Sequence, residues 1–134
     1  MRYLSTGVDE AGRSCVVHEI DPSAERGRTI FRAHEMPLSV PPIEAALRRD
    51  LQIDPGGIRW VILHFEPGTH FELHASETVD LDIVLTGTID LVLETGTHAL
   101  GPGDGAVING INHGWQVGPE GCTLSAVVLG AVSR

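Results

Sequence analysis

One stretch of the chain, residues 68–87, gathers residue types that can move protons or bind a metal ion. Its sequence is GTHFELHASETVDLDIVLTG. In an extended strand alternate side chains face opposite sides, so His70, Glu72, His74 and Ser76 would share one face. This polar row is either a solvent-facing edge above an apolar packing face or one wall of a reactive pocket.

The end of the same stretch places two carboxylates in an apolar strand. Asp80, Asp82 and Val84 share one face, and the two leucines and the isoleucine between and after them share the other. A buried carboxylate needs water or a partner. The aspartates therefore lie either on the wet outside of the sheet or inside a cavity, with the apolar face covered by another sheet, an arm or a second subunit. Inside a cavity, Asp82 would be a general base or a group that orients a histidine ligand.

A third group of reactive residues lies at NGINHGW, residues 109–115. His113 and Trp115 share a face if this segment is extended. Such a pair is either a half-buried structural contact or a pocket wall with one group that can titrate or bind a metal.

Glycine and proline divide the second half of the chain into short β-rich runs, which would position these residues. The runs lie at 58–66, 78–86, 88–94, 97–100, 106–109, 113–117 and 122–132. Short strands at nearly regular spacing, with turn residues between them, are typical of a β-sandwich or a small barrel.

The first third of the chain is less regular. Residues 15–20 and 29–33 are expected strands, and 42–51 is an expected short helix with proline in its first turn. We therefore expect a single all-β domain over residues 1–134, with an N-terminal arm and edge strands at 1–57 and the barrel core at 58–132.

The segments taken together resemble a small single-domain cupin of the RmlC-like cupin-2 type. The usual first cupin motif reads G-x5-H-x-H-x(3,4)-E-x6-G. Counting back from Gly87 places Asp80 at the Glu position and His74 and Ser76 at the two His positions. His113 ends the G-x-x-H of the second motif. This resemblance implies a double-stranded β-helix, that is, a jelly-roll barrel.

Two further pieces of the sequence are similar to a subgroup of cupins. The opening TGVDEAGRS, at residues 6–14, matches a segment that this subgroup carries early, and HASETVDL and GINHGW match segments that it carries later. The part of the chain that matches the two cupin motifs runs from residue 66 to residue 129, about half of its length.

The resemblance also implies a candidate metal site. Cupins with a complete set of three His and one Glu bind iron, manganese, nickel or zinc. Here Ser76 stands at the second His position and Asp80 at the Glu position. A set of His74, Asp80 and His113 remains, which suits Fe(II) and also zinc. His70 could complete a fourth position.

The leading hypothesis is an enzyme that holds a divalent metal in the barrel. It would carry out cyclisation, isomerisation, decarboxylation or oxygenation of a small organic substrate, polyketide-like or carbonyl-bearing. The residues expected to act on the substrate are His70, Asp82 and His113, and those expected to line its pocket are Ser76, Val84, Leu93 and Trp115.

Two other hypotheses stay open. A metal-free cupin would use His113 and a carboxylate as an acid/base pair, and a non-catalytic barrel would only bind a small ligand. The position of the carboxylates discriminates between them, because an enzyme needs Asp80 and Asp82 inside the barrel with perturbed pKa values.

Composition limits the partners. Nine Lys+Arg against eighteen Asp+Glu give a net charge of −9. Nucleic acids and anionic membrane surfaces require basic patches, so we expect neither as a partner. No apolar run approaches the roughly 20 residues of a membrane span, and the N-terminus lacks a secretory signal. These features predict a cytoplasmic protein.

The cysteines and the edge strands add two expectations. Cys15 and Cys122 are far apart in the sequence, and we expect two free thiols. We also expect a homodimer, because the candidate strands at 16–20 and 29–33 could cover a barrel edge of the same or a neighbouring chain.

Overall fold

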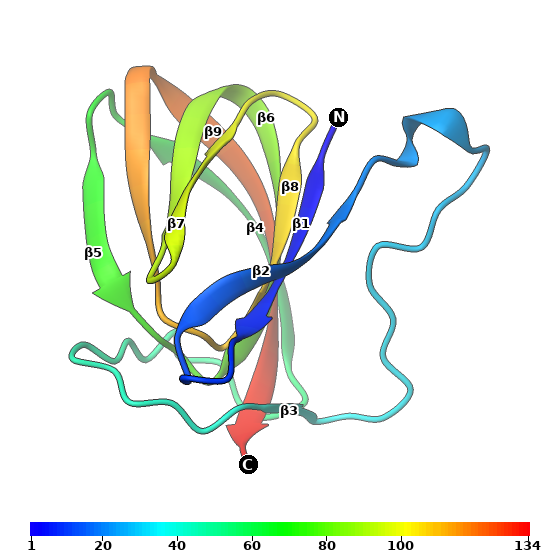
Figure 1. Ribbon diagram of the computed structural model, residues 1–134, viewed down its shortest axis with the longest axis vertical. Helices are drawn as coiled ribbons and strands as arrows, with labels where there is room; N and C mark the ends of the chain where they lie inside the picture. The colour runs from blue at the N-terminus through cyan, green and yellow to red at the C-terminus, as the bar shows by residue number, and fades with distance from the viewer.

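The computed structural model describes residues 1–134, and the chain folds almost entirely into β-strands (Figure 1). One short 3-10 turn, η1 (Pro22–Ala24), is its only helical element. The all-β expectation is therefore confirmed. No helix of the structure has the length and apolar character that crossing a membrane requires. The strands are β1 (Tyr3–Val8), β2 (Ser14–Ile20), β3 (Leu38–Val40), β4 (Ile58–Phe65), β5 (His70–His74), β6 (Thr78–Leu93), β7 (Gly96–Leu100), β8 (Gly105–Asn109) and β9 (His113–Ser133).

Two long antiparallel strands, β6 and β9, form the centre of the barrel. Their pairing extends from Thr78 to Val92 on β6. The first half of β6 also pairs with β8 and its second half with β7, while β9 pairs with β5 near its start and with β4 further on. The ladder shifts register beside Gly87, where a Cβ atom would collide with the carbonyl group of Gly121. Both glycines have positive φ (+75° and +79°), so the strands can bend closely past each other here.

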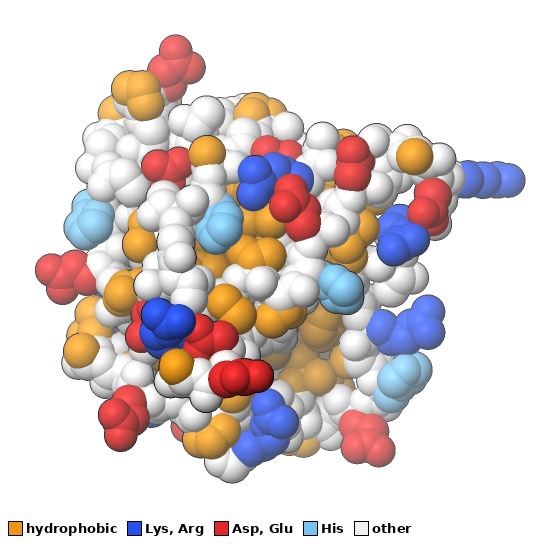
Figure 2. Space-filling model, in the orientation of Figure 1, with side chains coloured by type: hydrophobic (Ala, Val, Ile, Leu, Met, Phe, Trp, Pro, Cys, Tyr) orange, Lys and Arg blue, Asp and Glu red, His pale blue; other side chains and the backbone are white.

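The hydrophobic core fills the closed end of the barrel. A cluster of 13 buried residues includes Leu4, Ile89, Leu91 and Ile111, each at most 1% exposed. A second cluster around Val40 lies on the other side of the sheet, where the arm crosses it. In Figure 2 hydrophobic side chains are visible in a recess between the barrel and this arm.

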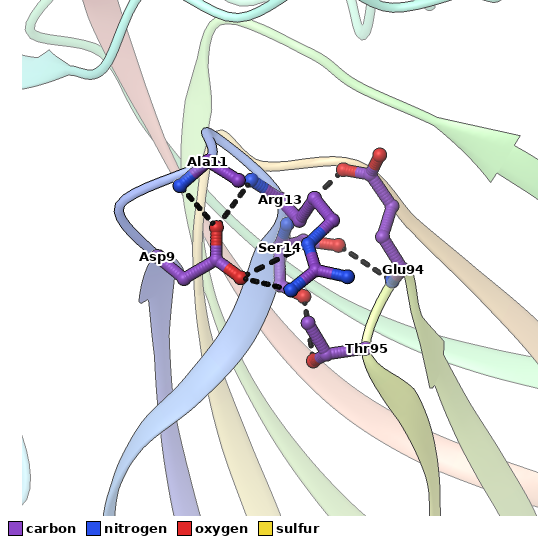
Figure 3. Close-up of polar contacts among 6 residues, drawn as sticks. All are labelled: Asp9, Ala11, Arg13, Ser14, Glu94 and Thr95. Atoms are coloured by element: carbon purple, nitrogen blue, oxygen red, sulfur yellow. Dashed lines mark hydrogen bonds and ion pairs between the residues drawn. The ribbon is translucent and has the colours of Figure 1, made fainter.

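The N-terminal hairpin of β1 and β2 is fastened to the barrel by polar contacts at its turn (Figure 3). One carboxylate oxygen of Asp9 accepts the backbone N–H groups of Ala11 and Arg13, both at 2.9 Å. Ser14 is fully buried; its Oγ accepts the N–H of Glu94 at 2.8 Å, and its own N–H donates to the Glu94 carboxylate at 3.0 Å. Asp9 and Arg13 thus close the turn of the hairpin, and Ser14 connects the hairpin to the turn between β6 and β7.

The expected helix at 42–51 is wrong. The backbone N–H of Arg49 donates to the carbonyl of Ala75 at 2.9 Å, and the N–H of Ala75 donates to the carbonyl of Leu47 at 3.0 Å. These backbone groups are therefore used to bind the arm to the turn after β5, and they are not available for a helical ladder.

The strand assignments in the first third are partly right. The expected strand at 15–20 is confirmed as β2, but 29–33 forms no strand. The side chains of Ile30 and Phe31 instead pack on the second cluster, around Val40. The pattern also misses β1 and β3. β3 pairs only in parallel, with β9, so no hairpin turn indicates it, whereas β1 forms a hairpin with β2 whose turn the pattern does not identify. Both cysteines are free thiols, as expected.

Part of the outer sheet face stays uncovered, and it is apolar. Alternation places Ile58, Trp60 and Ile62 on the outer side of β4, with Ile83 and Leu85 on the outer side of β6. Their exposed fractions range from 39% to 73%. No Asp, Glu or Arg occupies an outward position of β4, of β6 as far as Leu85, or of the facing part of β9. In a chain of net charge −9, a second copy meets the least repulsion on this face.

Removal of the Ser14 hydroxyl tests the contacts of the hairpin turn. Ser14→Ala removes the acceptor of the Glu94 N–H at a fully buried position, so we expect the free energy of unfolding to fall by about 1–3 kcal/mol. Urea denaturation followed by circular dichroism measures this change. Ser39→Ala, at an exposed strand position, is the control and should change stability by less than about 0.5 kcal/mol. Equal losses in both variants would contradict the interpretation.

The homodimer remains a prediction, and the apolar face of β4 and β6 is where we expect it to form. Size-exclusion chromatography with light scattering should give the dimer mass for the wild type. Trp60→Glu should give the monomer mass, because it would bury two unpaired carboxylates in the interface. Val17→Glu, at an exposed apolar position of β2, is the matched control and should stay dimeric. A wild type at monomer mass would refute the prediction, and dissociation by Val17→Glu alone would move the interface to β2.

Candidate functional site

A cavity of about 380 Å³ opens into the barrel beside β4, β5, β6 and β9. This size suits a small organic molecule. Its wall is mainly apolar and aromatic, and its polar side chains are two histidines, two aspartates and two arginines. The polar lining residues are Arg49, Arg59, His74, Asp80, Asp82 and His113, and the aromatic ones are Phe65, Phe71 and Trp115.

The two histidines face each other across the pairing of β5 with β9. His74 lies opposite His113 in the ladder, and their ring centroids are 4.4 Å apart. Both are buried, at 8% and 3% exposure. The ring of Trp115 lies edge-on to His113, with centroids 6.1 Å apart. The end of β5 and the start of β9 thus bring together two side chains that are far apart in the sequence.

Backbone hydrogen bonds set the tautomer of both imidazoles. Nδ1 of His74 lies 2.8 Å from the carbonyl oxygen of Glu72, and Nδ1 of His113 lies 2.9 Å from that of Ile111. A carbonyl oxygen only accepts, so each Nδ1 carries the hydrogen and each Nε2 is left as an acceptor. Burial lowers the pKa of His113 to about 4 and also lowers the pKa of His74. Both rings are therefore neutral at physiological pH.

The two aspartates lie on the inner face of β6. Asp82 is 7% exposed, and Asp80 is half-buried beside it in the cavity wall. Burial raises the pKa of Asp80 to about 6, although a hydrogen bond from the Thr78 hydroxyl acts in the opposite direction. Burial, and then the neighbouring Asp80 charge, raise the pKa of Asp82 well above its usual range. The alternative that places these carboxylates outside the barrel is wrong.

A chain of hydroxyl groups leads from Asp80 to a second cavity. Thr78 Oγ1 donates to Asp80 Oδ1 at 2.8 Å, and Ser76 Oγ lies 2.8 Å from Thr78 Oγ1. Both hydroxyl residues are almost fully buried. They line a separate cavity of about 290 Å³ under the arm, next to Arg48. Ser76 was expected in the substrate pocket, and the structure places it behind Asp80 instead.

His70 lies away from the cavity. It is exposed at the start of β5, where its Nδ1 lies 3.0 Å from Oε1 of Gln116. The ladder of β5 shifts register between Phe71 and His74, so these two residues both line the cavity although an odd number of positions separates them. Strict alternation puts His70 and His74 on one face, and the bulge breaks that alternation.

Of the three other residues expected to line the pocket, one lines the cavity and two do not. Trp115 lines the cavity, as expected from its face of β9. Val84 and Leu93 belong instead to the buried core, at 1% and 3% exposure, and do not line the cavity. The core closes the barrel below the site, so residues further along β6 lie beneath the substrate space.

The sequence reading misses two arginines and two phenylalanines of the cavity. Arg59 and Phe65 alternate with outward residues along β4, so the period of this strand could have placed them inside. Arg49 lies in the arm and Phe71 beside the bulge of β5. No local pattern indicates that either one reaches the cavity.

The metal site implied by the resemblance can be compared with the donors present. Nowhere in the chain are three His, Cys, Asp or Glu side chains close enough together to hold a metal ion. His74 and His113 supply two adjacent nitrogen donors, but Asp80 does not join them as a third ligand. The residues do not fit the His74–Asp80–His113 centre, and we derive no step through a metal.

Sequence comparison finds partial relatives in a fungus. The chain is 43% identical over 63 residues to two proteins of Diaporthe leptostromiformis, phomopsin biosynthesis cluster proteins C' and D. The match covers 46% of this chain and 33% of each relative, so the chain spans about a third of the length of the curated relatives it matches. No protein-family model matches the sequence.

Solved structures identify the fold. A cupin superfamily protein from Desulfitobacterium hafniense has a TM-score of 0.50 at 14% identity, covering 55% of this chain and 67% of its own. The cupin domain of Schizosaccharomyces pombe Cnp3 has a TM-score of 0.50 at 11% identity, covering 60% and 55%. The polyketide cyclase RemF from Streptomyces resistomycificus has a TM-score of 0.49 at 29% identity, covering 53% of each chain. The first two of these structures confirm the expected jelly-roll barrel, so the chain has the fold of the cupins.

The raised pKa values of the aspartates predict a pH-dependent effect of Asp82→Asn. Between the ordinary carboxyl pKa near 4 and the raised values, the folded state holds protons that the unfolded state has lost. For Asp80 this part of the stability is therefore lost as the pH rises through about 6, and for Asp82 it is lost as the pH rises through the raised pKa of that group. We compare the free energy of unfolding of Asp82→Asn with that of the wild type at each pH. The difference should favour the variant by about 1–3 kcal/mol more at pH 8 than at pH 4.

Urea denaturation at pH 4, 6 and 8 measures this difference. The histidines have lowered pKa values and add stability as the pH rises from about 4 to 6.5, but both proteins share this contribution. Asp90→Asn is the matched control, because Asp90 is on the same strand and outside the cavity. A stability difference for Asp82→Asn that does not change with pH would contradict the assignment.

Proposed function

We propose that this cupin is an enzyme that moves a proton at a carbon atom next to a carbonyl group of a small, largely apolar substrate. One observation carries the proposal: a buried and a half-buried carboxyl group line the same apolar cavity as two neutral imidazoles. Groups with perturbed proton affinity in a cavity of substrate size are typical of acid/base catalysis. Cyclisation and isomerisation of carbonyl compounds both use this proton transfer.

The two carboxyl groups would have different roles. Asp80, with a pKa of about 6, is ionised near neutral pH and close to the optimum for a general base. Asp82 is more deeply buried and keeps its proton to higher pH, so it would donate a proton or a hydrogen bond. The environment thus separates one base from one acid on the same strand.

The imidazoles would orient the substrate. Nε2 of His74 and Nε2 of His113 are the ring atoms left without a backbone partner, and both accept hydrogen bonds in the neutral state. A pKa of about 4 makes His113 a poor base at neutral pH. We therefore assign these nitrogens to holding a hydroxyl or enol group of the substrate.

The partial relatives support a small-molecule substrate. Their names place the two Diaporthe proteins in phomopsin biosynthesis. The similarity covers about a third of each of those proteins, so it favours a substrate of natural-product size for this chain and leaves the reaction to be measured. Burial of the carboxylates favours catalysis over a barrel that only binds a ligand.

A metal-dependent enzyme is the second candidate, and one observation favours it. Both Nδ1 atoms are held by backbone carbonyls, as in many metal-binding histidines, where this contact fixes the ring and leaves Nε2 for the metal. If iron, zinc, nickel or manganese were bound, His74 and His113 would hold it, and it would supply a Lewis acid that polarises a carbonyl oxygen.

Exchange of carbon-bound hydrogen for deuterium tests the acid/base proposal without knowledge of the natural substrate. The wild type would be incubated in D2O with a panel of small aryl ketones and 1,3-dicarbonyl compounds, and exchange next to the carbonyl would be followed by proton NMR. We expect accelerated exchange for some members of the panel. Asp80→Asn should reduce the rate by about 10²–10⁴-fold, whereas Asp90→Asn should keep it. No exchange above background for any compound would refute the proposal.

Removal of metal ions separates the two candidates. Exchange that persists after dialysis against a chelator supports the metal-free site. Exchange that disappears and returns with iron, zinc, nickel or manganese supports the second candidate. In that case metal content measured by mass spectrometry should be near-stoichiometric in the wild type and absent from His113→Ala.

A further inference from the structure

Two arginines of the cavity have no carboxylate partner. The chain holds nine basic side chains, all of them arginine, and eighteen acidic ones. Arg2, Arg13 and Arg28 form ion pairs. Arg49 and Arg59 form none, although acidic residues outnumber arginines two to one in this chain. Both of these arginines line the barrel cavity.

The arm holds Arg49 in a defined position. Its backbone N–H donates to the carbonyl of Ala75, one residue after His74. Its guanidinium carbon lies 5.4 Å from the ring centroid of Phe71, within the range of a cation–π contact. Its charge also acts on the imidazoles: burial is the main cause of the lowered pKa of His74, and Arg49 contributes to it.

The second arginine lies at the other polar group of the cavity. Arg59 is on the inner side of β4, and its charge lowers the pKa of Asp80, against the larger effect of burial. The Arg59 guanidinium and the Asp80 carboxyl group are too far apart to form an ion pair. The guanidinium is therefore free to bind another anion. Two guanidinium groups therefore line the cavity, and no ion pair neutralises either of them.

We propose that the cavity takes substrates that carry a carboxylate, which Arg49 and Arg59 bind at the rim while the apolar part lies among Phe65, Phe71 and Trp115. This inference rests on the proposed function, because it names the substrate class of the same site. A guanidinium group binds a carboxylate with two parallel hydrogen bonds. The bound acid would extend from the rim toward Asp80 and the histidines.

A matched pair of small probes tests this directly: 3-phenylpropanoate and its neutral amide, 3-phenylpropanamide. Two-dimensional NMR would follow the indole N–H signals of the two tryptophans. Trp115 lines the cavity and Trp60 is 73% exposed on the outer face, so Trp60 is an internal control. Titration of the Trp115 signal gives the dissociation constant of each probe. We expect the constant of the acid to be at least ten-fold lower than that of the amide, and to rise as salt is added.

Three variants assign the preference to its residues. Arg49→Gln and Arg59→Gln should each weaken binding of the acid about ten- to a hundred-fold and leave binding of the amide unchanged. Arg48→Gln is the matched control, because the Arg48 guanidinium donates to the carbonyl of Ile43 and lines the other cavity. Retained preference in Arg48→Gln together with its loss in the other two supports the proposal.

Three results would overturn this inference. They are equal binding of acid and amide at Trp115, binding of the acid that moves only Trp60, and no shift of Trp115 by the acid at millimolar concentration. Equal binding would leave the acid/base proposal standing, since the cavity would then take neutral compounds. The deuterium exchange of neutral ketones is independent of this test, so the failures of the two proposals are distinguishable.

Discussion

The pairing of β6 with β9 is the constraint on which the rest of the structure depends. These strands pair over most of their length and bend together where Gly87 passes Gly121. The bend lets one pair of strands contribute to both halves of the barrel. It also leaves the first half of β6, with both aspartates, facing the cavity. The second half turns its apolar residues into the closed core. A side chain at Gly87 would collide with the backbone of Gly121 and force these two strands apart at the centre of the barrel.

The apolar wall of the barrel destabilises the charged forms of the acidic and imidazole side chains that line the cavity. Asp80 and Asp82 lie in a wall of aliphatic and aromatic residues, where a charged carboxylate is poorly solvated. The same wall keeps His74 and His113 neutral. Burial therefore raises the proton affinity of the acids and lowers that of the imidazoles, so that all four groups can be uncharged in slightly acidic solution. The barrel loses stability at neutral pH through this arrangement and gains a base close to its working pKa.

The sequence predicts the barrel better than the arm, and the reason is physical. The strands after residue 58 are bounded by glycine or proline and most pair with antiparallel neighbours, so turn residues mark their ends. In the arm, the backbone at Arg49 bonds Ala75, far away in the sequence, and no local propensity encodes that contact. His70 shows a second limit. Alternation puts it beside His74, but a single register shift in β5 turns it outward. The histidines and aspartates of the cavity were predictable because each lies on a regular strand face or at the end of a cupin motif.

Ser76 explains how this site departs from the metal-binding pattern that the chain resembles. It stands where the motif has its second histidine, and its hydroxyl contacts Thr78, which in turn donates to Asp80. The serine instead extends a chain of hydroxyl groups from a carboxylate to a second cavity. A hydroxyl that donates to Asp80 stabilises its ionised form against burial, so this chain favours Asp80 over Asp82 as the charged member of the pair. At this position the chain thus has a hydroxyl group, which supports the carboxylate that would act as the base.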